Sequence, residues 1–142
     1  MKVLFIDDDR RRMSKYAREL EDNGYEVIFE DNVNDALTTL RSQKDLDLVI
    51  LDISMPPGTE YKFEDTVGGT RTGLAVYDTI RSERPELRIV ALTNVSDSRV
   101  TDHFGRDSRG LGQLVRKPDV LPRQFAEFVG RFLTGKDGEE TS

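Results

Sequence analysis

Acidic side chains follow two short apolar runs of this sequence, and each run has the composition of a buried strand. Val3–Ile6 leads into Asp7–Asp9, and Leu48–Leu51 leads into Asp52. Unbroken apolar runs of this length are typical of parallel strands that helices cover on both faces. Because Pro56–Gly58 then forces a turn, Asp52 is expected at the carboxyl end of a central strand, where open α/β sheets carry their ligand sites.

Asp7, Asp8 and Asp52 would meet at one edge if the sheet has the strand order 2-1-3-4-5, which is common for this chain length. Three close carboxylates repel one another unless a cation lies among them, and oxygen ligands with room for water suit Mg²⁺. Thr93 and Lys117 end two further strand-like runs, so they would bring a hydroxyl group and a positive charge to the same edge. This set suits phosphoryl transfer with Asp52 as the nucleophile. We expect Lys117 to pair with Asp52 before that transfer.

The elements that must position these residues alternate between strand and helix patterns. Strands are predicted at residues 3–6, 25–29, 48–51, 87–92 and 114–116. Apolar residues at helical spacing predict helices that carry Met13–Leu20, Val33–Leu40 with Asn32 as N-cap, Thr72–Arg84 and Pro122–Phe132. Residues 95–110 predict at most a short, weakly held helix around Val100 and Phe104. Right-handed crossovers then give an α/β fold with a doubly wound, five-stranded parallel sheet in the flavodoxin-like order 2-1-3-4-5, covered by helices on both faces.

Length and composition limit the classes of protein that this chain can represent. Its 142 residues suit one domain, which we place at residues 1–134, followed by a flexible tail at 135–142. The net charge of −6 argues against nucleic-acid binding, and the lack of cysteine excludes disulfides and thiolate metal sites. No run is long enough to span a membrane, and the first residues do not resemble a signal peptide. We therefore expect a cytoplasmic protein with neither nucleic-acid nor membrane partners.

Together these motifs resemble the receiver domain of two-component response regulators, of the chemotaxis type that stands alone. The resemblance covers roughly residues 2–133. It rests on Phe5–Asp9, Asp52–Pro56, Ala91–Thr93 and Lys117-Pro118. It implies a phosphoacceptor signalling domain rather than an enzyme. The phosphoryl donor would be a sensor histidine kinase or a histidine phosphotransfer protein, and the output would pass to an unknown downstream protein by conformational change or phosphorelay.

The same resemblance implies a role for each residue at the predicted edge. Asp52 would be the phosphoacceptor, and Mg²⁺ would be held by Asp7, Asp8, Asp52 and the backbone carbonyl of Ser54. Thr93 and Lys117 would contact the phosphoryl group. Asp9 lies just past the acidic pair of the family and is interpreted as a solvated turn residue.

Three departures from the family pattern stand out. Leu114 occupies a position where the family usually has tyrosine or phenylalanine, so the predicted switch region consists of Thr93 and Leu114. Asn94 stands where a small residue is usual. In the family, a Gly-Leu pair normally follows the phosphoacceptor closely, whereas here the pair Gly73-Leu74 comes much later. The loop at residues 57–72 is therefore enlarged by roughly a dozen residues.

The enlarged loop carries its own pattern. Tyr61 and Phe63 alternate with charged residues, Gly68-Gly69 suits a turn, and Thr70–Thr72 could return as a second strand. We therefore predict a short hairpin. Because it would begin at the reactive edge, our hypothesis is that it forms an ordered flap that contributes to partner choice.

Two other functions fit part of the sequence. Asp7–Asp9 followed by Ile89–Asn94 also resembles the first two motifs of haloacid-dehalogenase-type phosphohydrolases, but Asp52 would then have no role. A receiver-like scaffold that binds partners without being phosphorylated is the other alternative. The complete set of acidic, hydroxyl and lysine residues argues against that scaffold, because a scaffold does not need them.

Overall fold

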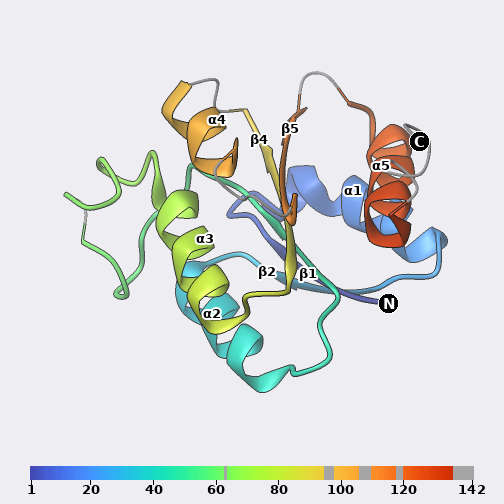
Figure 1. The fold of residues 1–142 in the computed structure, drawn as a ribbon, viewed down its shortest axis with the longest axis horizontal. Coiled ribbons are helices and arrows are strands. Elements are labelled where there is room, and N and C mark those ends of the chain that lie inside the picture. Colours follow the sequence, from blue (N-terminus) through green and yellow to red (C-terminus); the bar gives the residue numbers. More distant parts are fainter. Residues whose placement is uncertain (63, 95–97, 106–109, 118–119, 136–142) are drawn as a thin grey trace.

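The computed structural model describes residues 1–62, 64–94, 98–105, 110–117 and 120–135. Within them, five parallel strands form one sheet in the order β2-β1-β3-β4-β5, which confirms the predicted doubly wound α/β fold (Figure 1). The strands are β1 (Lys2–Ile6), β2 (Glu26–Glu30), β3 (Leu48–Leu51), β4 (Arg88–Thr93) and β5 (Gly112–Arg116). The helices are α1 (Arg10–Asp22), α2 (Val33–Ser42), α3 (Thr72–Glu83), α4 (Ser98–Gly105) and α5 (Pro122–Thr134).

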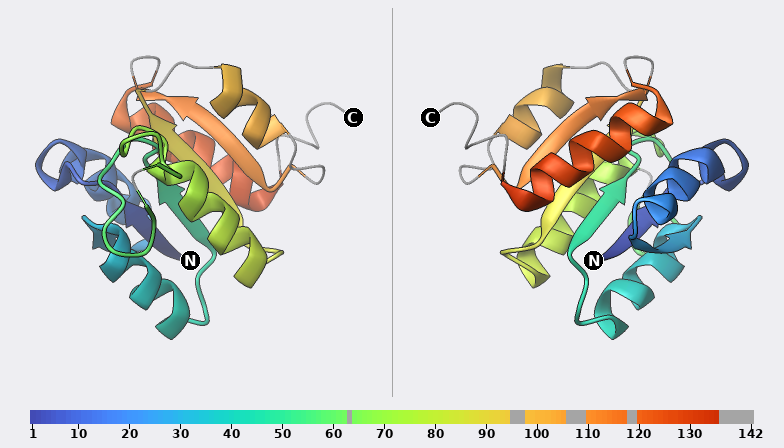
Figure 2. Two further views of the ribbon diagram at one scale, coloured as in Figure 1. Left: turned by 90° about the vertical axis from the view of Figure 1, so that its left-hand side faces the viewer. Right: turned by 90° about the vertical axis from the view of Figure 1, so that its right-hand side faces the viewer.

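Helices cover the sheet on both faces and enclose a separate apolar cluster on each. Helices α1 and α5 lie on one face of the sheet, and α2, α3 and α4 lie on the other (Figure 2). The apolar side chains of each group form one of the two clusters. The central strand β3 supplies both clusters, because Val49 and Leu51 point to the α2–α4 face while Leu48 and Ile50 point to the α1–α5 face. All four residues are fully buried, which explains why the strand has no polar alternation.

The helix starts follow local side-chain chemistry. The Asn32 side chain accepts a hydrogen bond from the Asp35 amide at 2.9 Å, which confirms the predicted N-cap of α2. Asp9 caps α1 in the same way, because its carboxylate accepts from the Arg12 amide at 3.2 Å. Asp9 is therefore a capping residue, and its interpretation as a solvated turn residue was incomplete.

The weakly patterned segment 95–110 does contain a helix. It is α4, eight residues long, and Val100 and Phe104 are the buried residues that hold it on the sheet. At the other end of the chain, α5 ends at Thr134 with Gly135 as its left-handed C-cap. The predicted tail beyond Gly135 lies outside the described residues. No helix in the described part of the chain combines the length and the apolar character needed to cross a bilayer.

The predicted hairpin is wrong, because the described residues between β3 and α3 form turns and no strand; Phe63 lies outside them. Three consecutive residues, Val67, Gly68 and Gly69, have positive φ values of 53°, 66° and 89°. A left-handed stretch of this length coils the chain, and the Arg71 amide closes the coil by donating to the Thr66 carbonyl at 2.8 Å. We call residues 57–71 the insert.

Two contacts hold the outer part of the insert against the helices. The Asn34 side chain on α2 donates to the Thr59 hydroxyl at 2.8 Å and accepts from the Thr59 amide at 3.2 Å. On α3, the Tyr61 and Thr79 hydroxyls lie 2.6 Å apart and share a hydrogen bond. The insert thus lies beside α2 and α3, as Figure 2 shows.

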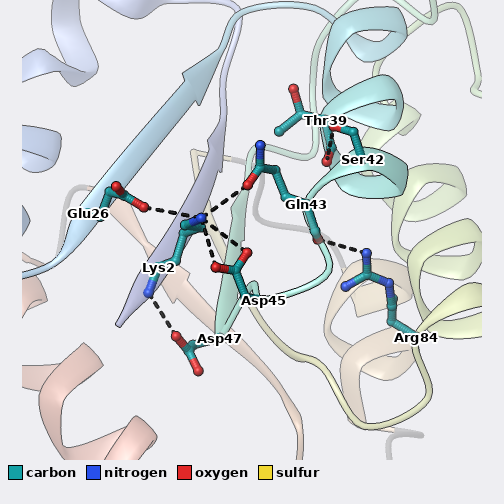
Figure 3. A network of polar contacts seen from close by, with 8 residues as sticks. All are labelled: Lys2, Glu26, Thr39, Ser42, Gln43, Asp45, Asp47 and Arg84. Atoms are coloured by element: carbon teal, nitrogen blue, oxygen red, sulfur yellow. Dashed lines mark hydrogen bonds and ion pairs between the residues drawn. The ribbon is translucent and has the colours of Figure 1, made fainter.

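A polar network fastens the amino ends of the strands, opposite the edge that carries the predicted site (Figure 3). The Lys2 ammonium lies 2.9 Å from a carboxylate oxygen of Asp45 and 3.3 Å from one of Glu26, and it donates to the Gln43 side chain at 3.1 Å. The Arg84 guanidinium donates to the Gln43 carbonyl at 2.9 Å. These contacts connect the turns before β3 and β4 to strands β1 and β2. They all lie at the amino ends of the strands, so none of them occupies the carboxyl edge.

Helix α3 begins so close to the end of β3 that only glycine fits at its second position. The Gly73 amide donates to the Ile53 carbonyl at 2.8 Å. A Cβ atom at Gly73 would lie 2.5 Å from the Ile53 Cα and still closer to the Asp52 carbonyl oxygen. Both neighbours are backbone, so neither can move aside without shifting the site.

We therefore predict that Gly73→Ala lowers the free energy of unfolding by about 3 kcal/mol through overpacking. The matched control is Gly130→Ala, also within a helix, where the nearest atom to a new Cβ is the Tyr25 hydroxyl at 3.6 Å. That control should be neutral or stabilising by up to about 1 kcal/mol, because alanine favours helix. Urea denaturation compares the two; equal effects would contradict the close approach.

Candidate functional site

Strand register brings the predicted residues to one edge. Ile6 pairs with Leu51, and Leu51 pairs with Ala91, so the residues that follow these three strand positions are neighbours. The Asp52 amide extends the ladder by donating to the Ile6 carbonyl at 2.9 Å. Thr93 is the last residue of β4, and Lys117 directly follows β5. Each polar residue therefore stands at the carboxyl end of its strand, at the same edge of the sheet.

Three carboxylates form the centre of the site. Asp7 and Asp52 are 1% and 7% exposed, whereas Asp8 is exposed, and one oxygen from each lies within 4.8 Å of the others. Ser54 lines the same cavity of about 320 Å³. The structure therefore places all four residues predicted to hold Mg²⁺ around one cavity, and an oxygen-only donor set of this kind fits a hard divalent cation.

Lys117 lies between the two buried carboxylates. Its ammonium donates to Asp7 Oδ2 at 3.0 Å and lies 3.7 Å from Asp52 Oδ2. The expected contact with Asp52 is present, but the shorter contact is with Asp7. One lysine thus neutralises part of two buried negative charges, and its side chain is only 15% exposed.

Burial makes this arrangement electrostatically costly. Desolvation is the main cause that raises the pKa of Asp52 from 3.8 to about 6, and the negative charge of Asp7 raises it further. The Lys117 charge and a hydrogen bond from the Thr93 side chain act in the opposite direction on the pKa of Asp52 without cancelling the rise. Desolvation also raises the pKa of Asp7. The site therefore carries more negative charge than its own lysine neutralises, which is the condition that favours a bound cation.

The predicted switch residues lie on the face covered by α2, α3 and α4. Thr93 is fully buried and, by strand alternation, points to the same face as Ala91. Leu114 pairs with Ala91 in register and packs, partly buried, against that cluster. Next to it, the aromatic contact beneath α4 comes from α3, since the rings of Tyr77 and Phe104 are 4.7 Å apart. The sequence did not single out Tyr77, because an apolar position at helical spacing carries no sign of that contact.

Asn94, the second departure from the family pattern, is exposed and lines the cavity together with Lys117. Sequence reasoning also missed the backbone bonds that hold the chain just after Asp52. The Met55 amide donates to the Gly69 carbonyl at 3.1 Å, which links this segment to the insert. The only sequence signal for that link was the pair of glycines in an otherwise polar loop.

Comparisons with known proteins identify a family and a shared fold. The sequence pattern of the response regulator receiver domain family matches residues 3–118. Response regulator MprA of Mycolicibacterium vanbaalenii is 30% identical over 129 residues, a stretch that spans 89% of this chain but 45% of that protein. The chain thus spans less than half the length of this relative.

Solved structures share the fold at low identity. A CheY-like response regulator receiver domain protein from Methanospirillum hungatei has a TM-score of 0.74 at 21% identity, with 97% of each chain covered. The response regulator DrrB of Thermotoga maritima has a TM-score of 0.70 at 24% identity, covering 95% of this chain and 53% of that one. Chemotaxis protein CheY4 of Vibrio cholerae gives 0.71 at 22%, covering 92% of this chain and 97% of that one.

The raised pKa of Asp52 predicts how stability depends on pH in the metal-free protein. Between about pH 4 and pH 6 the folded state holds a proton that the unfolded state has lost, so the free energy of unfolding should fall as pH rises through this range. Asp52→Asn removes that charge and should stabilise the protein at pH 7 by about 2 kcal/mol, with little effect below about pH 4.

Urea denaturation in chelator across this pH range measures the difference. Asp65→Asn is the matched control, because Asp65 is exposed and should leave the profile unchanged. Equal stability of the parent and Asp52→Asn at pH 7 would contradict the electrostatic cost assigned to Asp52.

Proposed function

Because the chain belongs to the response regulator receiver domain family, we propose that it accepts a phosphoryl group on Asp52 and passes on the signal by conformational change. The observation that carries the proposal is the Asp52 carboxylate, buried at the edge of the sheet with Asp7 beside it and Lys117 within reach of both. Buried carboxylates that destabilise the protein occur mostly at functional sites, and phosphoryl transfer is a reaction that uses such a pair.

In the proposed reaction, one Asp52 carboxylate oxygen attacks the phosphorus of a phosphohistidine on the donor. A new oxygen–phosphorus bond forms an acyl phosphate, and the nitrogen–phosphorus bond to the imidazole breaks. The released imidazole nitrogen keeps the bonding electron pair and takes a proton from solvent. The product carries the phosphoryl group on Asp52, whose negative charge has moved outward onto the phosphoryl oxygens.

Asp7, Asp8, Asp52 and the Ser54 carbonyl would hold Mg²⁺, which when bound offsets the repulsion between these carboxylates and an anionic phosphoryl donor. Lys117 and Thr93 would bind the phosphoryl group after its transfer. The ammonium that contacts Asp7 and Asp52 at rest can transfer its contact to a phosphoryl oxygen, and the Thr93 hydroxyl can donate to another. Thr93 lies on the same face of the sheet as Leu114, whose register partner on β4 is Ala91, two residues before Thr93. We therefore assign these two residues to the switch.

We propose a sensor histidine kinase or a histidine phosphotransfer protein as the donor, and a downstream protein as the target. The rival phosphohydrolase needs a further acidic residue at this edge beyond Lys117. In the described part of the chain after Lys117 the only acidic side chain is Glu127, which lies on α5 within 3.7 Å of Arg123. That position does not serve a hydrolase site, so we favour the signalling function over turnover as an enzyme.

We expect incubation with a small acyl phosphate and Mg²⁺ to add a single phosphoryl group to the protein. The product should be labile to hydroxylamine, as an acyl phosphate is, and intact-mass spectrometry measures its yield. Labelling should disappear in Asp52→Asn and in chelator, because the nucleophile or the neutralising cation is then missing. Asp9→Asn is the matched control: it keeps the helix cap and should be labelled like the parent. Undiminished labelling of Asp52→Asn would refute the proposal.

We also expect Lys117→Ala to separate metal binding from the response. Removing an ammonium that contacts Asp7 and Asp52 should leave Mg²⁺ affinity unchanged or tighter, since one competing cation is lost. The change in amide chemical shifts at Thr93 and Leu114 on adding beryllofluoride should fall by at least about half, because the phosphoryl contact is absent. Lys44→Ala, an exposed change remote from the edge, serves as the control. Parallel loss of both properties, or of neither, would contradict this role.

A further inference from the structure

The inner half of the insert is bonded to the segment that follows the phosphoacceptor. The Met55 amide donates to the Gly69 carbonyl at 3.1 Å, and the Gly73 amide donates to the Ile53 carbonyl at 2.8 Å. Ser54 lies between these two anchored residues and lines the cavity of the carboxylates. The position of the Ser54 peptide is therefore set by backbone groups of the insert and of the first turn of α3.

The Gly69 peptide that forms this anchor sits at the end of an unusual turn. Val67, Gly68 and Gly69 are all left-handed, and Val67 is β-branched, a residue type that rarely adopts positive φ. The Val67 side chain is 59% exposed, so apolar burial does not account for its conformation. Hydrogen bonds that close the turn do, including the Thr70 hydroxyl donating to the Val67 carbonyl at 2.7 Å.

Two buried threonines hold Gly69, one through its amide and the other through its carbonyl. The Thr66 hydroxyl accepts from the Gly69 amide at 3.2 Å and donates to the Lys62 carbonyl at 3.2 Å. The Thr72 hydroxyl donates to the Gly69 carbonyl at 3.2 Å. Both threonines are fully buried. A buried hydroxyl that both donates and accepts fixes its partners in place, because breaking either bond leaves an unsatisfied polar group away from water.

We propose that Thr66 is a positioning residue for the phosphoryl-accepting site. Through the Gly69 peptide it fixes the Met55 amide, and through Met55 the Ser54 carbonyl that would bind Mg²⁺. Mg²⁺ requires near-ideal octahedral geometry, so a small displacement of one backbone ligand weakens binding. The ligand role of Ser54 rests on the proposed function; the anchoring of Met55 by Thr66 does not. The insert thus becomes part of the site's support, in addition to any part it has in partner choice.

The test is Thr66→Val, which keeps the shape of the side chain and removes the hydroxyl. In the metal-free protein, hydrogen exchange at the Met55 amide should become about tenfold faster, the effect of weakening one hydrogen-bonded link. The apparent dissociation constant for Mg²⁺, followed by amide chemical shifts, should rise about three- to tenfold. Labelling by a small acyl phosphate should slow at limiting Mg²⁺ and return to within about twofold of the parent rate at saturating Mg²⁺.

Two further variants separate positioning from a general loss of stability. Thr66→Ser restores the hydroxyl and should return exchange and Mg²⁺ affinity to parent values. Thr59→Val removes an exposed hydroxyl from the outer part of the insert, one that bonds to the Asn34 side chain rather than to Gly69, and should leave both measurements unchanged. If Thr66→Val does not fold, Thr72→Val weakens the hold on the same peptide and is judged by the same measurements.

The outcomes divide cleanly. Unchanged Met55 exchange and Mg²⁺ affinity in Thr66→Val would overturn the inference, as would equal effects of Thr59→Val or faster exchange spread uniformly over all amides. Failure of the proposed function looks different, because the parent would then take no phosphoryl group while Met55 exchange still reported on the Thr66 link. Faster exchange confined to residues 53–55 and 66–73, with weaker Mg²⁺ binding and rescue by Thr66→Ser, is the expected result.

Discussion

The feature on which the rest of this structure depends is a pair of buried carboxylates that share one lysine. Asp7 and Asp52 are nearly inaccessible, and the Lys117 ammonium reaches both. One positive charge cannot neutralise two, so burial keeps the pKa of Asp52 raised to about 6. The folded protein therefore holds Asp52 at an electrostatic cost that a bound cation would reduce.

The packing of the strands beneath the site offsets the electrostatic cost of burying these carboxylates. β3 is buried on both faces, and a separate apolar cluster packs against each face. At its carboxyl end, Gly73 lets α3 approach the backbone of Asp52 and Ile53 without a side chain between them. At its amino end, the Lys2 network ties neighbouring turns together. Rigid support on both ends keeps the carboxylates close despite their repulsion.

The sequence was informative where a pattern depends on burial and uninformative where it depends on local turn chemistry. Apolar runs that end in polar residues predicted which residues meet at one edge of the sheet, since the carboxyl ends of parallel strands lie at the same edge. The strand order itself came from what is common for a chain of this length. The predicted hairpin failed because period-2 alternation around Tyr61 says nothing about the left-handed turn at Val67–Gly69. The closer contact of Lys117 with Asp7 was equally unpredictable, because it depends on side-chain geometry within a few ångströms.

Because the core consists of two separate clusters, a movement of a site residue would affect mainly the cluster on its own face of the sheet. Thr93 and Leu114 belong to the face that α2, α3 and α4 cover, and the partly buried Tyr61 of the insert packs against the same cluster. The α1–α5 face is a separate cluster, divided from the first by the sheet itself. Under the proposed function, a displacement of Thr93 would act on the cluster that contains the buried residues of α4 and that also contacts the insert. The insert is thus connected to the surroundings of Asp52 twice, by the bond between the Met55 amide and the Gly69 carbonyl and by the apolar cluster that Tyr61 and Leu114 both contact.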